Sequence, residues 1–253
     1  SVLAIATVPY GRERVVEQTL YDVMSGALKV VSQSGAVLAG GHSSEGAELA
    51  FGLTVNGFIA PDQVLRKGGL RPGDALILTK PVGTGTLFAA DMRRRAKGRW
   101  VDAAIQTMLL SSQAAAECLQ DFGVSACTDV TGFGLLGHLV EMTRSAGVDA
   151  ELCIDDIPIL AGAAETVAAG ILSSLQPQNL RLRRAVRDLE RAAHHPRYPL
   201  LFDPQTAGGL LAGVPGARAE DCILALKACG YPETALVGRV LERSDAAEPI
   251  VLI

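Results

Sequence analysis

Short apolar runs rich in β-branched residues alternate with longer stretches of helical periodicity along this chain of 253 residues. The first run, Val2–Val8, predicts a strand. The apolar residues of Arg12–Gln33 recur every three or four positions, which predicts a helix with one buried face. Chains that mix strands and helices in this way fold into packed layers. The alternation therefore predicts an α+β fold with α/β layering.

The same patterns predict the other elements. Strands are predicted at residues 37–39, 48–59, 75–79, 150–154, 210–214, 235–241 and 249–253, and helices at residues 84–95, 101–122, 135–140, 160–169, 180–193 and 217–229. The glycines and the proline of Arg66–Asp74 predict a hinge between two parts of the chain. Because domains usually begin with a few loose residues rather than with a strand, we expect the first domain to be truncated.

The charge balance limits the class of partner. The formal net charge is -4, which argues against extended nucleic-acid binding because that requires an excess of Lys and Arg. One basic run, Arg93–Arg99, lies beside the only tryptophan, Trp100. Such a run is either a solvated helix end or a stacking surface for single-stranded nucleic acid. We expect the former, and no nucleic-acid partner.

The five cysteines carry no recognisable pattern. They are odd in number, scattered, and form no Cys-x-x-Cys pair, so neither a disulfide framework nor a zinc site is predicted. The apolar start Ser1–Val8 has no basic segment typical of a signal peptide, and no apolar run is long enough to span a membrane. We therefore expect a reducing, cytoplasmic setting and no membrane partner.

The segment Thr128–His138, with sequence TDVTGFGLLGH, is the strongest candidate for a functional site. Asp129 lies just ahead of a glycine-rich turn that opens an amphipathic helix. The start of such a helix attracts phosphate, and a neighbouring carboxylate can hold a magnesium ion that bridges to that phosphate. The alternative is structural: Asp129 and Thr131 can be ordinary helix-capping residues.

Three other glycine-rich segments are weaker candidates. Gly40-Gly41-His42 lies between two predicted strands, and is either a place where backbone approaches a ligand closely or a simple connecting turn. Lys80–Thr86 lacks the Walker pattern, so a tight structural turn is the better interpretation. Asp203–Gly209 offers polar groups and glycines, but most such loops are architectural.

Read together and in order, these segments resemble the selenophosphate synthetase (selenide, water dikinase) family. The resemblance rests on the segments Leu38–Ser43, Leu65–Asp74, Leu78–Gly85, Thr128–His138 and Asp203–Leu211, and it spans nearly the whole chain. It implies the two-domain fold shared with aminoimidazole ribonucleotide synthetase. In that fold, residues 1–67 are the back half of an N-terminal ATP-binding and dimerisation domain, and residues 68–253 are the C-terminal α+β domain.

The resemblance also implies roles for particular residues. Asp129 is expected to bind Mg²⁺, and Gly40, Gly41 and His42 are expected to contact an ATP that is bound mainly by the other subunit of a homodimer. The implied reaction converts ATP, selenide and water to AMP, phosphate and selenophosphate. Since hydroselenide is already a strong anionic nucleophile, positioning and charge neutralisation by magnesium suffice, without a general base.

One departure from the family matters. Members carry a reactive Cys or selenocysteine, a Lys and further metal-binding aspartates upstream of the part that matches this chain, and none of these has a counterpart here. No catalytic residue is therefore assigned, and this polypeptide is expected to be a fragment that is inactive alone. Two alternatives stay open: a non-catalytic nucleotide-binding or dimerisation module, and another ATP-using enzyme of the superfamily, such as a thiamine monophosphate kinase or a hydrogenase-maturation protein.

Overall fold

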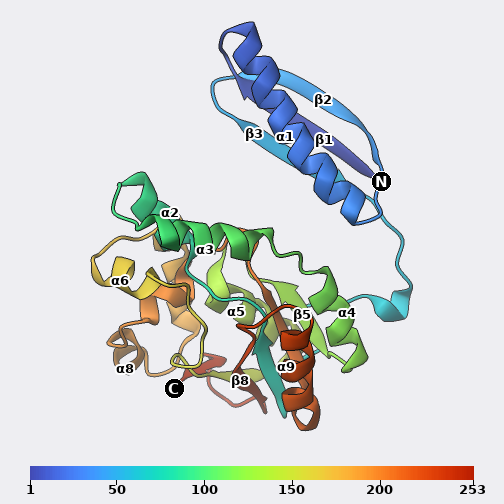
Figure 1. Ribbon diagram of the computed structural model, residues 1–253. Coiled ribbons are helices and arrows are strands. Elements are labelled where there is room, and N and C mark those ends of the chain that lie inside the picture. Colours follow the sequence, from blue (N-terminus) through green and yellow to red (C-terminus); the bar gives the residue numbers. More distant parts are fainter. The chain divides into compact units, whose positions relative to one another are not determined.

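The computed structural model describes residues 1–253, which divide into two compact units, residues 1–64 and 65–253 (Figure 1). The domain boundary predicted between residues 67 and 68 lies three residues beyond this division. Each unit has its own sheet. The units are therefore described separately.

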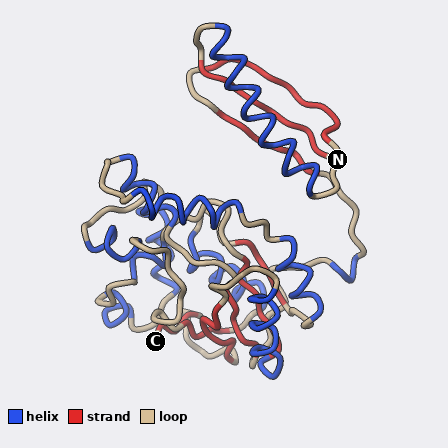
Figure 2. Tube along the Cα trace, viewed as in Figure 1, coloured by secondary structure: helices blue, strands red, loops and turns tan.

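The first unit is a three-stranded sheet with one helix on one face (Figure 2). Its elements are β1 (Val2–Pro9), α1 (Glu13–Gln33), β2 (Leu38–Gly46) and β3 (Ala50–Val55), followed by a short 3₁₀ turn at Pro61–Gln63. The central strand β1 pairs in parallel with β2 and antiparallel with β3. Alternate β1 residues, from Val2 to Val8, are buried, whereas Leu3 and Ile5 on the other face are 43% and 58% exposed.

The second unit is built on a six-stranded mixed sheet in the order β5-β7-β4-β8-β6-β9. The strands are β4 (Asp74–Leu78), β5 (Ala126–Asp129), β6 (Asp149–Leu152), β7 (Leu210–Pro215), β8 (Ala235–Leu241) and β9 (Ile250–Leu252). All neighbouring pairs are antiparallel except β6 and β9. The apolar β4, buried throughout, lies near the centre of the sheet.

Helices cover both faces of this sheet. They are α2 (Thr84–Met92), α3 (Gly98–Leu109), α4 (Gln113–Asp121), α5 (Gly134–Ala146), α6 (Ala163–Ala168), α7 (Gln176–Asn179), α8 (Leu189–Ala193) and α9 (Ala219–Ala228), with 3₁₀ turns at Leu180–Ala185, Tyr198–Phe202 and Gly216–Arg218. Successive side chains of β4 point to opposite faces of the sheet and pack in two different hydrophobic cores. Leu76 and Leu78 pack in the core that includes α5, and Ile77 packs in the core of α4 and α9. The predicted layering is confirmed.

Two predicted helices are wrong because tertiary contacts break them. The helix predicted at residues 101–122 is interrupted at Leu110–Ser112, where the Lys80 ammonium and the Tyr231 hydroxyl each donate to a backbone carbonyl. The helix predicted at residues 180–193 is interrupted at Val186, which is extended and pairs with Ile250. A backbone carbonyl or amide that is hydrogen-bonded to a distant residue is not available for the hydrogen bonds that would continue the helix.

The strand predictions have three errors. The strand predicted at residues 37–39 does not end at the glycines but continues through Gly40, Gly41 and His42 as β2. The four-residue strand β5, which ends at Asp129, has no predicted counterpart. The strand β3 is also shorter than the predicted residues 48–59.

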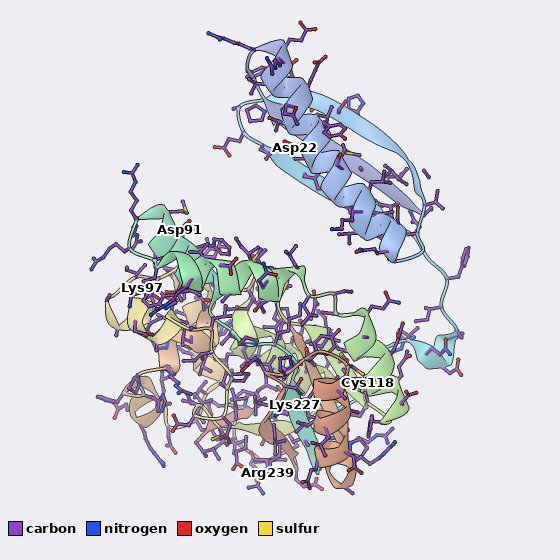
Figure 3. All side chains as sticks on the ribbon, viewed as in Figure 1. Asp22, Asp91, Lys97, Cys118, Lys227 and Arg239 are labelled. Carbon is purple, nitrogen blue, oxygen red and sulfur yellow. The ribbon has the colours of Figure 1, made fainter.

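Two further findings concern the whole chain. All five cysteines are free, and three of them, including Cys118 on α4, are buried (Figure 3). Burial raises the pKa of the Cys127 and Cys222 thiols to about 12, so these two are unreactive. No helix combines the length and hydrophobicity needed to cross a membrane.

Candidate functional site

Asp129 lies at the end of β5, where the chain leaves the sheet. The register pairs it with Leu210 of β7, and its neighbours Thr128 and Val130 are buried. Asp129 itself is exposed, and its carboxylate forms neither an ion pair nor a hydrogen bond within the chain. A surface carboxylate with no internal partner is available to a ligand.

The Asp129 side chain borders a shallow cavity of about 280 Å³. The cavity is also lined by Leu65, Lys67, Ala116, Cys127, Thr128 and Leu210. The Lys67 ammonium there lies 2.8 Å from a carboxylate oxygen of Glu141 on α5. Lys67 falls within Leu65–Asp74, one of the segments on which the family resemblance rests, whereas nothing in the sequence singles out Glu141 as its partner.

The turn after Asp129 is held by side chains from distant segments. The Asn179 side-chain amide donates to the carbonyl of Gly132 at 2.7 Å and to that of Phe202 at 3.0 Å. The Gln205 backbone amide donates to the Thr131 carbonyl at 3.0 Å. The turn is therefore fixed on two sides before any ligand binds.

The predicted capping role of Thr131 is wrong. Helix α5 begins at Gly134, and its N-cap is Phe133, with no side-chain cap. The Thr131 amide instead donates at 3.0 Å to the Nε2 atom of His138, one turn into the helix. The imidazole must be unprotonated at Nε2 to accept this bond.

His138 is a buried, neutral member of this arrangement. It is only 4% exposed, and burial lowers its pKa, with the nearby carboxylates of Asp129 and Glu141 acting in the opposite direction. Its Nδ1 atom has no hydrogen-bond partner. We therefore interpret His138 as a support for the turn and not as a ligand or base.

The segment Lys80–Thr86 is a structural turn, as the sequence predicts. The backbone amides of Gly83 and Thr84 donate to the side-chain oxygen of Gln205, and the amide of Gly85 donates to the Asp203 carboxyl at 3.0 Å. The start of α2 is thus occupied by the protein's own acceptors. A phosphate cannot use these amides.

Asp203 is a buried carboxyl group at the start of α2. It is 2% exposed, and burial raises its pKa to about 7, against the hydrogen bonds from Gln205 and from the α2 amides. The predicted architectural role of the loop Asp203–Gly209 matches this geometry: the loop joins the start of α2 to the turn after Asp129.

The basic run contains no stacking platform. Arg93, Arg94 and Arg95 are exposed in the turn after α2, and Lys97 lies over the ring of Trp100 at 4.7 Å from its centroid. Trp100 is itself buried among core residues. Its ring is unavailable for stacking on a base.

In the first unit, Gly40, Gly41 and His42 lie within β2, so the interpretation of this segment as a connecting turn is wrong. A Cβ atom on Gly41 would lie 1.9 Å from the carbonyl oxygen of Ala4, and the glycine has φ +154°. Only glycine allows β1 and β2 to pair here. The segment lines a cavity of about 250 Å³, together with Leu20 and Met24 of α1.

The predicted site residues thus lie in both units: Gly40, Gly41 and His42 in the first, and Asp129 in the second. The chain contains no group of three or more His, Cys, Asp or Glu side chains that could hold a metal ion. The Asp129 side chain is chemically suited to bind a magnesium ion, because it offers accessible carboxylate oxygens that no other group of the chain occupies. It is one ligand and not a complete set.

Comparison with known proteins places the fold. Residues 71–248 match the family described as AIR synthase related protein, C-terminal domain. Selenide, water dikinase 2 of Peptoclostridium acidaminophilum is 38% identical over 226 residues, which cover 89% of this chain and 65% of the relative. Selenide, water dikinase of Porphyromonas gingivalis is 33% identical over 252 residues, which cover 99% of this chain and 72% of the relative. The chain therefore spans only part of the length of the relatives it matches.

Solved structures show the same architecture. A crystal structure of the hydrogenase maturation protein HypE superimposes with a TM-score of 0.72 at 17% identity, covering 99% of this chain and 72% of that one. HypE in complex with ATP gives a TM-score of 0.65 at 15% identity, covering 99% of this chain and 69% of that one. At this identity the likeness concerns the fold alone, and it confirms the predicted superfamily fold.

Proposed function

The chain belongs to the selenide, water dikinase family, and from that premise we propose that the protein makes selenophosphate from selenide and ATP, with AMP and phosphate as the other products. One observation in the structure carries the proposal. Asp129 is exposed and unpaired at the end of β5, directly before a turn that is already fixed by Asn179 and Gln205.

We propose that Asp129 is a ligand of a magnesium ion on the ATP phosphates. Mg²⁺ bound there would neutralise charge on the phosphate oxygens. The chain's own contribution is geometric: the turn holds the carboxylate in place without closing it into an ion pair. Because magnesium is usually bound by one or two carboxylates together with phosphate oxygens, a single protein ligand from this unit is compatible with the role.

The amides after Asp129 support a phosphate site. The backbone amides of Gly132 and Phe133 make no hydrogen bond within the chain, whereas those at the start of α2 are satisfied by Gln205 and Asp203. Free amides ahead of a helix attract anions. Of the two glycine-rich helix starts, only the one at α5 is open to phosphate.

We propose that Gly40, Gly41 and His42 contact ATP, as the family resemblance implies. The exposed His42 and the absence of a Cβ atom at Gly40 and Gly41 leave this part of β2 accessible to a ligand. Replacing His42 with Ala should then raise the KM for ATP with little change in kcat, since a binding contact of this kind is made equally in the ground state and the transition state. An unchanged KM would remove His42 from the ATP site.

We also propose a homodimer with a shared ATP site, in a cytoplasmic setting. The open face of the first sheet carries the exposed apolar side chains Leu3 and Ile5, which no helix of this unit covers. Exposed apolar patches on a sheet favour association. Replacing Ile5 with Lys should lower the sedimentation coefficient to that of a monomer, and an unaffected dimer would mean that a different face is used.

A non-catalytic nucleotide-binding or dimerisation module is the second candidate. It is favoured by the lack of further metal-binding side chains around Asp129. Titration calorimetry with ATP and Mg²⁺ on this chain, with and without Asp129→Ala, tests the binding that both candidates require. Selenide-dependent release of AMP by the full-length protein then separates them: turnover supports the enzyme, and binding without turnover supports the module.

A further inference from the structure

Lys80 is a buried cation with no acidic partner. It follows the central strand β4, is only 2% exposed, and takes part in none of the chain's ion pairs. Removing an ammonium group from water is costly unless it is well hydrogen-bonded. Such a group therefore calls for an explanation in the contacts it makes.

The Lys80 ammonium donates to two backbone carbonyls from distant segments. One is the carbonyl of Leu110, at 2.5 Å, where α3 ends, and the other is that of Ala207, at 3.2 Å. A cation at the carboxyl end of a helix is favoured by the helix dipole. Lys80 thus joins the break between α3 and α4 to the loop Asp203–Gly209.

Ala207 is held in an unusual backbone conformation. Its φ is +49°, which residues with a side chain rarely adopt. A conformation of this kind persists only where the surroundings enforce it. The hydrogen bond from Lys80 to the Ala207 carbonyl is such a constraint.

The loop after Ala207 is packed directly against the candidate metal ligand. A Cβ atom on Gly208 would lie 2.1 Å from the carbonyl oxygen of Val130, the residue after Asp129. The carbonyl of Gly209 accepts a hydrogen bond from the Val130 amide at 2.8 Å. Any displacement of residues 207–209 therefore displaces the backbone that carries Asp129.

We propose that Lys80 is a positioning residue that fixes the Asp129 carboxylate through the loop residues 207–209. The link to magnesium rests on the function proposed above; the positioning of the loop does not. The structural consequence is a rigid support beneath the exposed Asp129 side chain. This role requires the ammonium group, because a hydrophobic side chain of the same length could not donate hydrogen bonds to the two carbonyls.

Amide hydrogen exchange tests the positioning directly. In Lys80→Met, exchange of the Val130 amide should accelerate at least ~5-fold relative to the amides of β6, because a supporting hydrogen bond is lost. The matched control Lys227→Met, on the exposed side of α9 (Figure 3), should leave both unchanged. An equal acceleration in β6, or none at Val130, would overturn the proposal.

A second measurement needs no variant. In the wild-type chain, the Lys80 ammonium should give a slowly exchanging NMR signal with couplings across hydrogen bonds to the carbonyl carbons of Leu110 and Ala207. Absence of both couplings overturns the proposal even if Lys80→Met fails to fold.

The link to the metal is tested by magnesium dependence in the full-length enzyme. Lys80→Met should raise the Mg²⁺ concentration for half-maximal AMP formation about 10-fold, with the rate restored at excess Mg²⁺, as expected for a group that orients a ligand. A lower maximal rate with unchanged Mg²⁺ dependence would contradict the positioning role at the metal. If Asp129→Asn leaves the Mg²⁺ dependence unchanged, the proposed function fails, whereas the exchange result still decides the role of Lys80 in the loop.

Discussion

Replacing Asp203 with Asn tests how the loop that supports Asp129 is stabilised. Burial raises the pKa of the Asp203 carboxyl from 3.8 to about 7. Between these values the folded protein keeps a proton that the unfolded chain has released, so stability falls as the pH rises. The protonated Asp203 carboxyl therefore contributes fully to the free energy of unfolding below pH 3.8, and this contribution is lost as the pH rises to about 7. A pKa difference of about three corresponds to roughly 4 kcal/mol, an order-of-magnitude value.

The substitution Asp203→Asn is a suitable probe because the side chain keeps its shape and cannot ionise. The amide oxygen can still accept the hydrogen bonds that Gly85 and Gln205 donate to the native carboxyl. The stability of the variant relative to the wild type should therefore rise between about pH 4 and pH 7. The total gain should be of the order of 4 kcal/mol.

Urea unfolding at a series of pH values measures the difference. The only tryptophan, Trp100, is buried in the second unit, so its fluorescence reports the unfolding of the unit that contains Asp203. Other titrating groups affect both proteins equally and cancel in the comparison. Two stability profiles that run parallel across this pH range would refute the claim that Asp203 is held as a neutral acid.

Three further predictions concern the supports of the two candidate segments. Gly41→Ala should destabilise the first unit by about 2 kcal/mol or more, because its Cβ atom would overlap the backbone of Ala4; limited proteolysis should show faster cleavage in residues 1–64 while the Trp100 transition stays unchanged. Asn179→Ala should cost about 1–3 kcal/mol, since the buried carbonyl of Phe202 and the more exposed carbonyl of Gly132 lose their donor, and thermal unfolding followed by fluorescence measures it. Lys67→Ala should cost less than about 1 kcal/mol, because its ion pair is exposed; a larger loss in the same assay would mean that Lys67 supports more than this pair.

The sequence predicts those strands that are marked by a run of apolar residues. The run Val2–Val8 is almost wholly apolar and forms a strand with one buried face, and β4 and β7 are apolar runs that cross the core. These elements are confirmed because local pattern and tertiary environment agree. The short β5 escapes prediction, since Ala126–Asp129 has neither the length nor the alternation that marks a strand.

The errors come from interactions between distant residues. The Ala-rich stretch at residues 101–122 favours one helix, but the Lys80 ammonium and the Tyr231 hydroxyl capture two carbonyls in its middle. Gly40 and Gly41 are typical of turns, yet β2 needs Gly41 because another residue there would collide with β1. In both cases the interacting residues are far apart in the sequence, so the local pattern of residues does not predict the structure.

The candidate site also combines features that the local sequence predicts with features that depend on distant residues. A carboxylate ahead of a glycine-rich helix start identifies Asp129 from sequence, and the structure finds it exposed and unpaired. The occupation of the start of α2 by Gln205 and Asp203 explains why Lys80–Thr86, similar in appearance, is closed to phosphate. That distinction depends on side chains far away along the chain.

The central claim is that Asp129 holds a magnesium ion on the ATP phosphates, and the magnesium dependence of selenide-dependent AMP formation in the full-length enzyme tests it most directly. Asp102→Asn, at an exposed acid on α3, is the matched control. Asp129→Asn should lower the rate at fixed Mg²⁺ by at least about 100-fold, more than the loss of a supporting group around a ligand, while the control stays at the wild-type rate. Equal rates and equal Mg²⁺ dependence in the two variants would contradict the account.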